Sequence, residues 1–365
     1  MVLNILDDPS NFQDHTVTYA ATTIMKVAYG KNTPTAATDP EVIEVRQVME
    51  ILQTVLGSGT YLVDSIPWLK YLPWYGQELK HGYEISKRIH TSQLNRVKQR
   101  MQSNVDLGPS FAKFVLENGR HYDLTELEMA FLAGAFFGAG ADTVAAAIST
   151  VLMAAACFPE EQATVQAELD EVIGRHRAPT FADQESLPRL QAFISEALRW
   201  RPLSPDGLDH RTTKDVTWAR RKLLHPSGHY GVRQPLASIM IVLAKCERPN
   251  CFSLRAISRD PEVYPEPDKF KPQRWMNDED HLRDDLKFFV FGFGRRVCPA
   301  QHVANRSVFI TSLLILWAFQ LTLDPTKPLD DMGFLNGNPQ PFSIEAKTRV
   351  PETELRRIME IYQNP

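Results

Sequence analysis

One short segment holds a cysteine whose neighbours favour reactive chemistry. The segment FGFGRRVCPA, residues 291–300, places Cys298 in a glycine-rich loop beside Arg295 and Arg296, directly before an apolar helix expected from His302 to Leu321. Positive charge and free backbone N–H groups stabilise a thiolate, the form of cysteine that ligates metals and attacks electrophiles. The loop therefore predicts a functional Cys298, and the alternative for the loop alone is a structural cysteine buried in the core.

The composition of the chain agrees with a reduced thiol in a globular protein. It has 365 residues, 40 Lys+Arg against 44 Asp+Glu, a formal net charge of -4 and 43% hydrophobic residues. The 4 cysteines are too few and too scattered for a disulfide scaffold. This length suits one large domain or two, and the nearly neutral balance argues against a nucleic-acid partner.

Helical patterns dominate the first third of the chain. Apolar periodicity predicts helices from Phe12 to about Gly30 and from Glu41 to about Leu56, and a charged helix from about Gln77 to Asn104. Between the last two, prolines stand among aromatic residues in YLVDSIPWLKYLPWYG, residues 61–76. That segment is expected to be an apolar loop.

The most apolar stretch of the chain, residues 129–158, is expected to be a long helix. Thr125 and Glu128 form a capping-box pattern at its start, and Asp142 is its one charged residue. Its length would suffice to cross a bilayer. A charge near mid-span and the lack of basic flanks favour a buried core helix, with a membrane span as the alternative. Further helices are expected at 159–174 and 187–200.

The cysteine loop resembles the haem-binding loop of the cytochrome P450 family, Phe-x-x-Gly-x-Arg-x-Cys-x-Gly. It matches at Phe291, Gly294, Arg296 and Cys298, with Ala300 at the last glycine, a change expected to crowd the haem slightly. AGADTV, residues 139–144, resembles the oxygen-activating segment of the family's central helix, with Val144 in place of a second threonine. EALR, residues 196–199, resembles the Glu-x-x-Arg motif, whose partner is expected to be Arg274 in KPQRW. The joint order and spacing of these motifs carry the resemblance.

The resemblance implies haem b with Cys298 as its axial thiolate ligand. Such a ligand pushes electron density onto the iron and favours O–O cleavage. Asp142 and Thr143 would relay protons to the distal oxygen, the alternative being a polar pair at a helix kink near Gly138 and Gly140.

Other matched residues are expected to hold the haem and its surroundings. Glu196 and Arg199 lie three apart on one helix face, where an ion pair with Arg274 would support the haem, although an ordinary surface pair is the alternative. Arg296 and His210 are expected to meet the haem propionates, with His210 equally a plain loop residue. Phe291 and Gly294 belong to the haem loop.

Two departures from the family pattern concern the start and the middle of the chain. The first residues carry no signal-peptide pattern, and Asp7, Asp8 and Asp14 argue against a membrane anchor there. Family members begin further upstream with an anchor, so residues 1–365 are expected to be one truncated P450 domain of an endoplasmic reticulum enzyme. Residues 217–255 are aberrant, and their codons permit a frameshift followed by a retained intron at 237–255. In that case Cys246 and Cys251 are not parts of the evolved protein.

The expected fold is mostly α with small β-sheets, the cytochrome P450 fold without its N-terminal part. The resemblance, closest to fungal microsomal members of secondary metabolism or xenobiotic conversion, implies a haem-thiolate monooxygenase. It would insert one oxygen atom of O2 into a hydrophobic small molecule, with electrons from NADPH through NADPH-cytochrome P450 reductase. The alternatives are a haem-thiolate isomerase or dehydratase, against which Asp142 and Thr143 argue, a truncated non-catalytic remnant, and a membrane protein built on residues 129–158.

Overall fold

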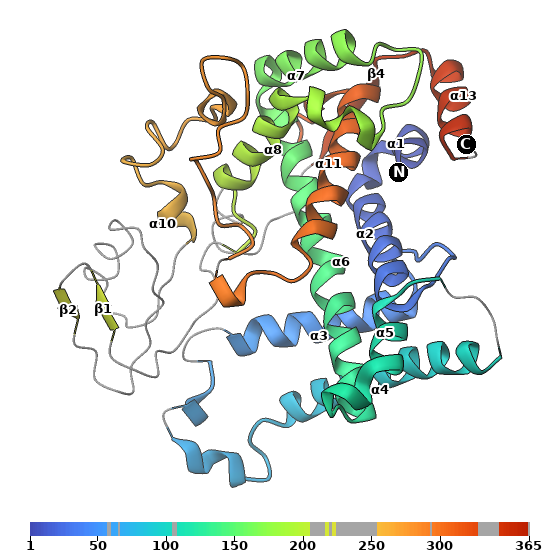
Figure 1. Ribbon diagram of the computed structural model, residues 1–365, viewed down its shortest axis with the longest axis vertical. Helices are drawn as coiled ribbons and strands as arrows, with labels where there is room; N and C mark the ends of the chain where they lie inside the picture. Colours follow the sequence, from blue (N-terminus) through green and yellow to red (C-terminus); the bar gives the residue numbers. More distant parts are fainter. Residues whose placement is uncertain are drawn as a thin grey trace. The chain divides into compact units, whose positions relative to one another are not determined.

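The computed structural model describes residues 1–56, 60–64, 66–103, 108–204, 216–218, 221–223, 254–292, 294–327 and 343–363. Helices predominate, with two small sheets, as the sequence predicts (Figure 1). The chain divides into two compact units. Unit 1 comprises Met1–Ser149 and Pro299–Thr311, and unit 2 comprises Thr150–Cys298 and Ser312–Pro365.

Helices are the regular secondary structure of unit 1 among its described residues. Its α-helices are α1 (Val2–Asp7), α2 (Phe12–Tyr29), α3 (Pro40–Leu56), α4 (Gln77–Gln102), α5 (Phe111–Asn118), most of α6 (Glu126–Cys157) and the start of α11 (Gln301–Ala318). Its 3-10 helices are η1 (Pro9–Asn11), η2 (Leu62–Asp64), η3 (Pro67–Tyr71) and η4 (Gly119–Tyr122). The expected loop at 61–76 thus contains two short helical turns. Pro67 supplies the φ angle that the start of the second one requires.

Helix α6 is packed closely by its neighbours in unit 1. Thr125 and Glu128 form the capping box, with Thr125 N–H donating to Glu128 Oε2 at 2.8 Å. A Cβ atom at Gly134 would lie 2.2 Å from the His90 ring of α4, and one at Gly140 would lie 2.7 Å from Ile24 of α2. These glycines therefore allow α4 and α2 to reach the backbone of α6.

The burial of α6 agrees with the expected core helix. Among the described residues α6 has the length and apolarity to cross a membrane, and 56% of its most apolar window is buried inside the protein. Fully buried side chains recur at helical spacing along it, at Ala130, Ala133, Phe137, Ala141 and Ile148.

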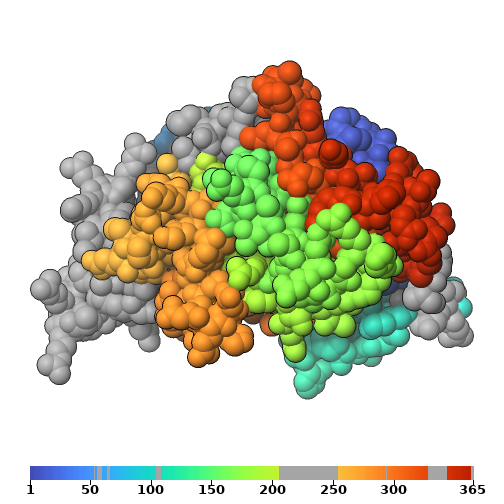
Figure 2. Space-filling view, turned by 90° about the horizontal axis from the view of Figure 1, so that it is seen from above, coloured from blue at the N-terminus to red at the C-terminus, as the bar shows by residue number. Residues whose placement is uncertain are grey.

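Among its described residues unit 2 combines helices with two antiparallel pairs of strands. It holds the end of α6, α7 (Pro159–Val172), α8 (Pro188–Trp200), α10 (Leu254–Ser258), the end of α11, α13 (Glu352–Gln363), η5 (Phe181–Ser186), η6 (Pro272–Trp275) and η7 (Gly294–Arg296). Strand β1 (Val216–Trp218) pairs with β2 (Arg221–Leu223), and β3 (Phe319–Leu323) pairs with β4 (Ile344–Thr348) in the register Phe319↔Thr348. The gold-to-orange segment 254–292 lies against the green of α7 and α8 (Figure 2).

The predicted helix from His302 to Leu321 is wrong at its C-terminal end. Helix α11 stops at Ala318, and residues 319–321 belong to β3. Phe319 and Leu321 are buried, whereas Gln320 is only half-buried, the alternation of a strand. The partners that convert this segment to a strand come from β4, more than twenty residues further along, where local periodicity gives no information.

Candidate functional site

The loop that carries Cys298 is a tight turn in unit 2 with an accessible thiol. Gly292 and Gly294 have φ angles of 70° and 61°, in the left-handed region that glycine adopts without steric cost. The Cys298 N–H donates to the Phe291 carbonyl at 2.9 Å, which folds the loop back on itself. The Cys298 side chain is half-buried and forms no disulfide, so the alternative of a buried structural cysteine does not describe it.

Two exposed arginines precede this cysteine. Arg295 and Arg296 lie in η7, and no described carboxylate forms an ion pair with either of them. The loop thus presents a soft sulfur ligand together with unpaired guanidinium groups. A haem group matches this donor set, because its iron takes a thiolate ligand and its propionates take cationic partners.

A buried ion cluster in the same unit is centred on Glu196 of α8. Arg199 donates from Nη2 to Glu196 Oε1 at 2.7 Å and from Nε to Oε2 at 2.8 Å. Arg274 of η6 donates from Nε to Oε1 at 3.1 Å, and the Trp275 indole N–H donates to Oε2 at 2.9 Å. Glu196 and Arg199 are fully buried, so they are not the surface pair that the sequence left open.

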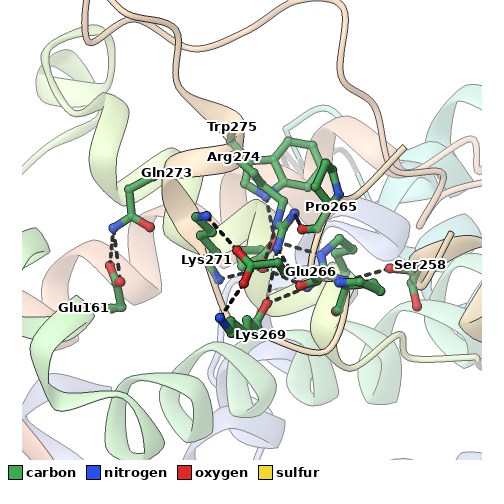
Figure 3. Close-up of polar contacts among 12 residues, drawn as sticks. Glu161, Ser258, Pro265, Glu266, Lys269, Lys271, Gln273, Arg274 and Trp275 are labelled. Carbon is green, nitrogen blue, oxygen red and sulfur yellow. Dashed lines mark hydrogen bonds and ion pairs between the residues drawn. The ribbon is translucent and has the colours of Figure 1, made fainter. Parts of the chain in front are cut away.

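The remaining guanidinium donors of this cluster hydrogen-bond to backbone carbonyls. Arg199 Nη1 donates to the carbonyl of Ser258 at 2.6 Å, and Arg274 Nη1 donates to that of Pro265 at 2.7 Å (Figure 3). The Lys271 N–H completes Glu196 by donating to Oε1 at 2.8 Å. Every charge is therefore hydrogen-bonded, and the cluster fastens the segment 258–275 to α8.

Exposed ion pairs and an amide surround this cluster. The ammonium groups of Lys269 and Lys271 hydrogen-bond to Glu266 and lower the pKa of that carboxyl to about 2. Gln273 donates through Nε2 to Glu161 of α7 at 2.8 Å, which ties η6 to a second helix (Figure 3).

The predicted proton-relay pair lies on α6 in unit 1. Asp142 Oδ1 accepts from Arg46 Nε of α3 at 3.1 Å, in an ion pair whose side chains are 35% and 34% exposed. Thr143 Oγ1 donates to the Ala139 carbonyl one turn earlier at 2.6 Å. Asp142 therefore pairs with α3 rather than with the glycine segment of its own helix.

Asp142 and Thr143 belong to the least covered face of α6. Exposed residues recur along this face at helical spacing, at Leu132, Ala135, Ala139, Thr143 and Ala146. The face is apolar apart from Asp142 and Thr143, and so it can line a site for an apolar molecule.

One predicted site residue lies outside the described residues, and two residues that contact the predicted ones were not predicted from the sequence. His210 is outside the described residues. Arg46 was not anticipated, because an arginine 96 positions from Asp142 carries no local signal. Trp275 was not anticipated either, although it directly follows Arg274 in the same helical turn.

A mostly helical fold with a half-buried, free cysteine in a glycine-containing loop is compatible with the haem-thiolate class of proteins. The sequence model of the cytochrome P450 family matches residues 7–223 and 251–345. Over 356 residues the chain is 45% identical to cytochrome P450 monooxygenase 88 of Postia placenta, covering 97% of this chain and 68% of that relative. Monooxygenase 113 of the same fungus is 44% identical over 357 residues, covering 97% and 68%. A cytochrome P450 monooxygenase of Armillaria gallica is 32% identical over 374 residues, covering 97% and 67%. The chain belongs to the cytochrome P450 family.

Membership makes the chain an oxidoreductase of the cytochrome P450 monooxygenase class. The family implies a haem cofactor, a redox partner and a small-molecule substrate, and its members are often membrane-associated.

Proposed function

We propose that this chain is a haem-thiolate monooxygenase that inserts one oxygen atom of O2 into a hydrophobic small molecule. Electrons would come from NADPH through NADPH-cytochrome P450 reductase. The observation that carries the proposal is the loop of Cys298, with its accessible thiol, its left-handed glycines and its unpaired Arg296. The apolar exposed face of α6 supports an apolar substrate.

In this proposal Cys298 would hold haem b through its thiolate. When bound, haem supplies the iron at which O2 is activated. Cys298 would bind that iron as a thiolate, Phe291 and Gly294 would shape the loop, and Arg296 would pair with a propionate. His210 is proposed as a second propionate partner. Glu196, Arg199 and Arg274 act through the fold, since their charges are already paired within the protein.

Asp142 and Thr143 are proposed to move protons toward the reacting oxygen. The described residues leave Oδ2 of Asp142 without a hydrogen-bond partner, while Oδ1 is held by Arg46. The Thr143 hydroxyl, which donates to Ala139, retains acceptor lone pairs for a water or substrate oxygen.

The carbon monoxide difference spectrum of the reduced protein tests the haem proposal. The chain loaded with haem should show the red-shifted Soret band of a thiolate ligand. Cys298→Ala should abolish that band, and Cys157→Ala, which changes the other described cysteine, should keep it. A chain that takes up no haem would contradict the proposal and support a non-catalytic remnant.

A requirement for NADPH, reductase and O2 separates the proposed reaction from its alternative. Turnover of an apolar substrate should stop when any one of the three is omitted. Turnover that continues without them would instead support an isomerase or dehydratase.

We propose that the chain associates with the endoplasmic reticulum membrane through residues 62–74. Leu62, Trp68, Tyr71 and Trp74 are 60%, 61%, 77% and 67% exposed. Tryptophan and tyrosine favour the bilayer interface, where an apolar ring and a polar edge are both accommodated. The double variant Trp68→Ser and Trp74→Ser should float less with phosphatidylcholine vesicles, and unchanged flotation would contradict this attachment.

We also propose that residues 1–365 form one P450 domain interrupted at 217–255 by a gene-model error. The family match supports this in part, because it stops at 223 and resumes at 251. Sequencing the transcript tests it: a message that retains these codons in frame excludes the idea.

A further inference from the structure

A cavity in unit 1 has no role in the reaction proposed above. It has a volume of about 290 Å³ and lies between the C-terminal ends of α2 and α4. Its polar lining comes from Tyr29, Lys31, Asn32, Thr33, Gln93, Arg96 and Arg100. The size is close to the lower limit of small-molecule sites in proteins.

Positive charge exceeds negative charge around this cavity. Arg96 and Arg100 are four residues apart on α4 and so share one face, and Lys31 adds a third cation. Glu41 accepts from Lys31 Nζ at 2.5 Å and lies 3.9 Å from Arg96 Nη1. Asp39 lies 3.9 Å from Lys31, and no described carboxylate pairs with Arg100.

A buried tyrosine adds a neutral donor to the lining. Tyr29 is 3% exposed, and its hydroxyl has no hydrogen-bond partner among the described residues. Burial and the negative charge of Glu41 raise the pKa of Tyr29, which keeps the hydroxyl protonated. Buried hydroxyl groups nearly always have a partner, so this one calls for an acceptor from outside the described residues.

We propose that this cavity binds a phosphate group, with Arg96, Arg100 and Tyr29 as its donors. Guanidinium groups match the geometry of phosphate oxygens and bind them in pairs. A soluble phosphomonoester and the headgroup of phosphatidic acid present the same group. Glu41 holds the ammonium group of Lys31 in place, and its negative charge repels the bound anion to some extent.

Calorimetric titration of the full chain with inorganic phosphate, at constant ionic strength and neutral pH, tests the site. Saturable binding of one phosphate per chain is expected. Arg96→Gln and Arg100→Gln should each weaken it by about tenfold or more, and Tyr29→Phe by about two- to tenfold. Glu41→Gln should tighten binding, because it removes a negative charge and keeps an acceptor for Lys31.

Lys80→Gln is the matched control, since it removes one positive charge from α4 outside the cavity. It should leave the affinity for phosphate unchanged, and thermal unfolding should show that all variants are folded.

Binding of the full chain to vesicles containing phosphatidic acid is a second experiment. Binding to them that depends on Arg100, without saturable inorganic phosphate binding, assigns the group to a lipid. No binding in either arm, or equal weakening by Lys80→Gln, would overturn the proposal.

Discussion

Two clusters of charged residues in unit 2 differ in how fully their polar groups are satisfied. Around Glu196 both carboxylate oxygens accept from the protein, and Arg199 and Arg274 spend their donors on Glu196 and on backbone carbonyls. Around Cys298 the thiol is accessible, and Arg295 and Arg296 pair with no described carboxylate.

This difference separates a cluster whose polar groups are all engaged within the fold from the loop that we propose to bind haem. Buried charges are tolerated only when they are paired and hydrogen-bonded, so the Glu196 cluster has no capacity left for a ligand. The Cys298 loop differs, because its thiol is half-buried and its two arginines form no ion pair with a described carboxylate. We expect the free energy of unfolding to respond strongly to changes at buried, paired groups and weakly to changes at the Cys298 loop.

Glu196→Ala should have the largest effect. The change leaves two buried guanidinium groups without their carboxylate, which costs about 3 to 5 kcal/mol. Urea unfolding of the variant measures the loss. Glu185→Ala, on an exposed side chain, should cost less than about 0.5 kcal/mol. A loss below about 1 kcal/mol for Glu196→Ala would show that the cluster is not essential to the fold.

His90 is a buried polar residue that, unlike Glu196, has a polar atom without a hydrogen-bond partner among the described residues. Its Nδ1 has no partner among the described residues, and burial lowers its pKa to about 4. The unfolded chain, with a histidine pKa near 6.5, binds the proton first as the pH falls. Stability should therefore decline between about pH 6.5 and 4, by about 2 to 3 kcal/mol from this residue.

The variant His90→Phe keeps an aromatic ring and removes this titration. Its unfolding free energy should change less between pH 7 and pH 4.5 than that of the parent chain. His81→Gln, on an exposed position of the same helix, serves as control and should keep the parent's pH dependence. An identical decline in His90→Phe would assign the acid sensitivity to other groups.

Gly294→Ala should have a moderate effect on stability and a large one on haem retention. A Cβ atom at Gly294 would meet nothing within 4 Å, so the cost is that of the left-handed backbone, about 1 kcal/mol. Gly174→Ala is a matched control, because Gly174 has a φ of 73° and equally open space. Both should lower stability alike, and only Gly294→Ala should lower the haem content per chain.

Cys298→Ala should have the smallest effect on the haem-free chain. The thiol is half-buried and unpaired, so the unfolding free energy should change by less than about 0.5 kcal/mol. Urea unfolding of the haem-free variant measures this. A loss comparable with that of Glu196→Ala would mean that Cys298 serves the fold and would remove the contrast between the two clusters.

Local sequence signals predict many of the helices that the structure contains. Helices α2, α3, α4, α6, α7 and α8 follow apolar periodicity and their capping residues, with ends within a few residues of expectation. Helices α1, α5 and α13 were not anticipated. Helix α1 has six residues and no side-chain cap, and a helix so short depends on tertiary packing for its stability.

The candidate site also combines features that local sequence predicts with features that depend on tertiary contacts. The sequence by itself determined the order and spacing of the cysteine loop, the α6 pair and the Glu-x-x-Arg motif, because each is a pattern of near neighbours along the chain. The tertiary structure alone decided that Glu196 and Arg199 are buried, that Arg46 pairs with Asp142, and that residues 319–321 form a strand. It also placed Tyr29 beside Arg96 in one cavity. Burial and partner choice depend on groups far apart in the sequence, and only the folded chain brings those groups within reach.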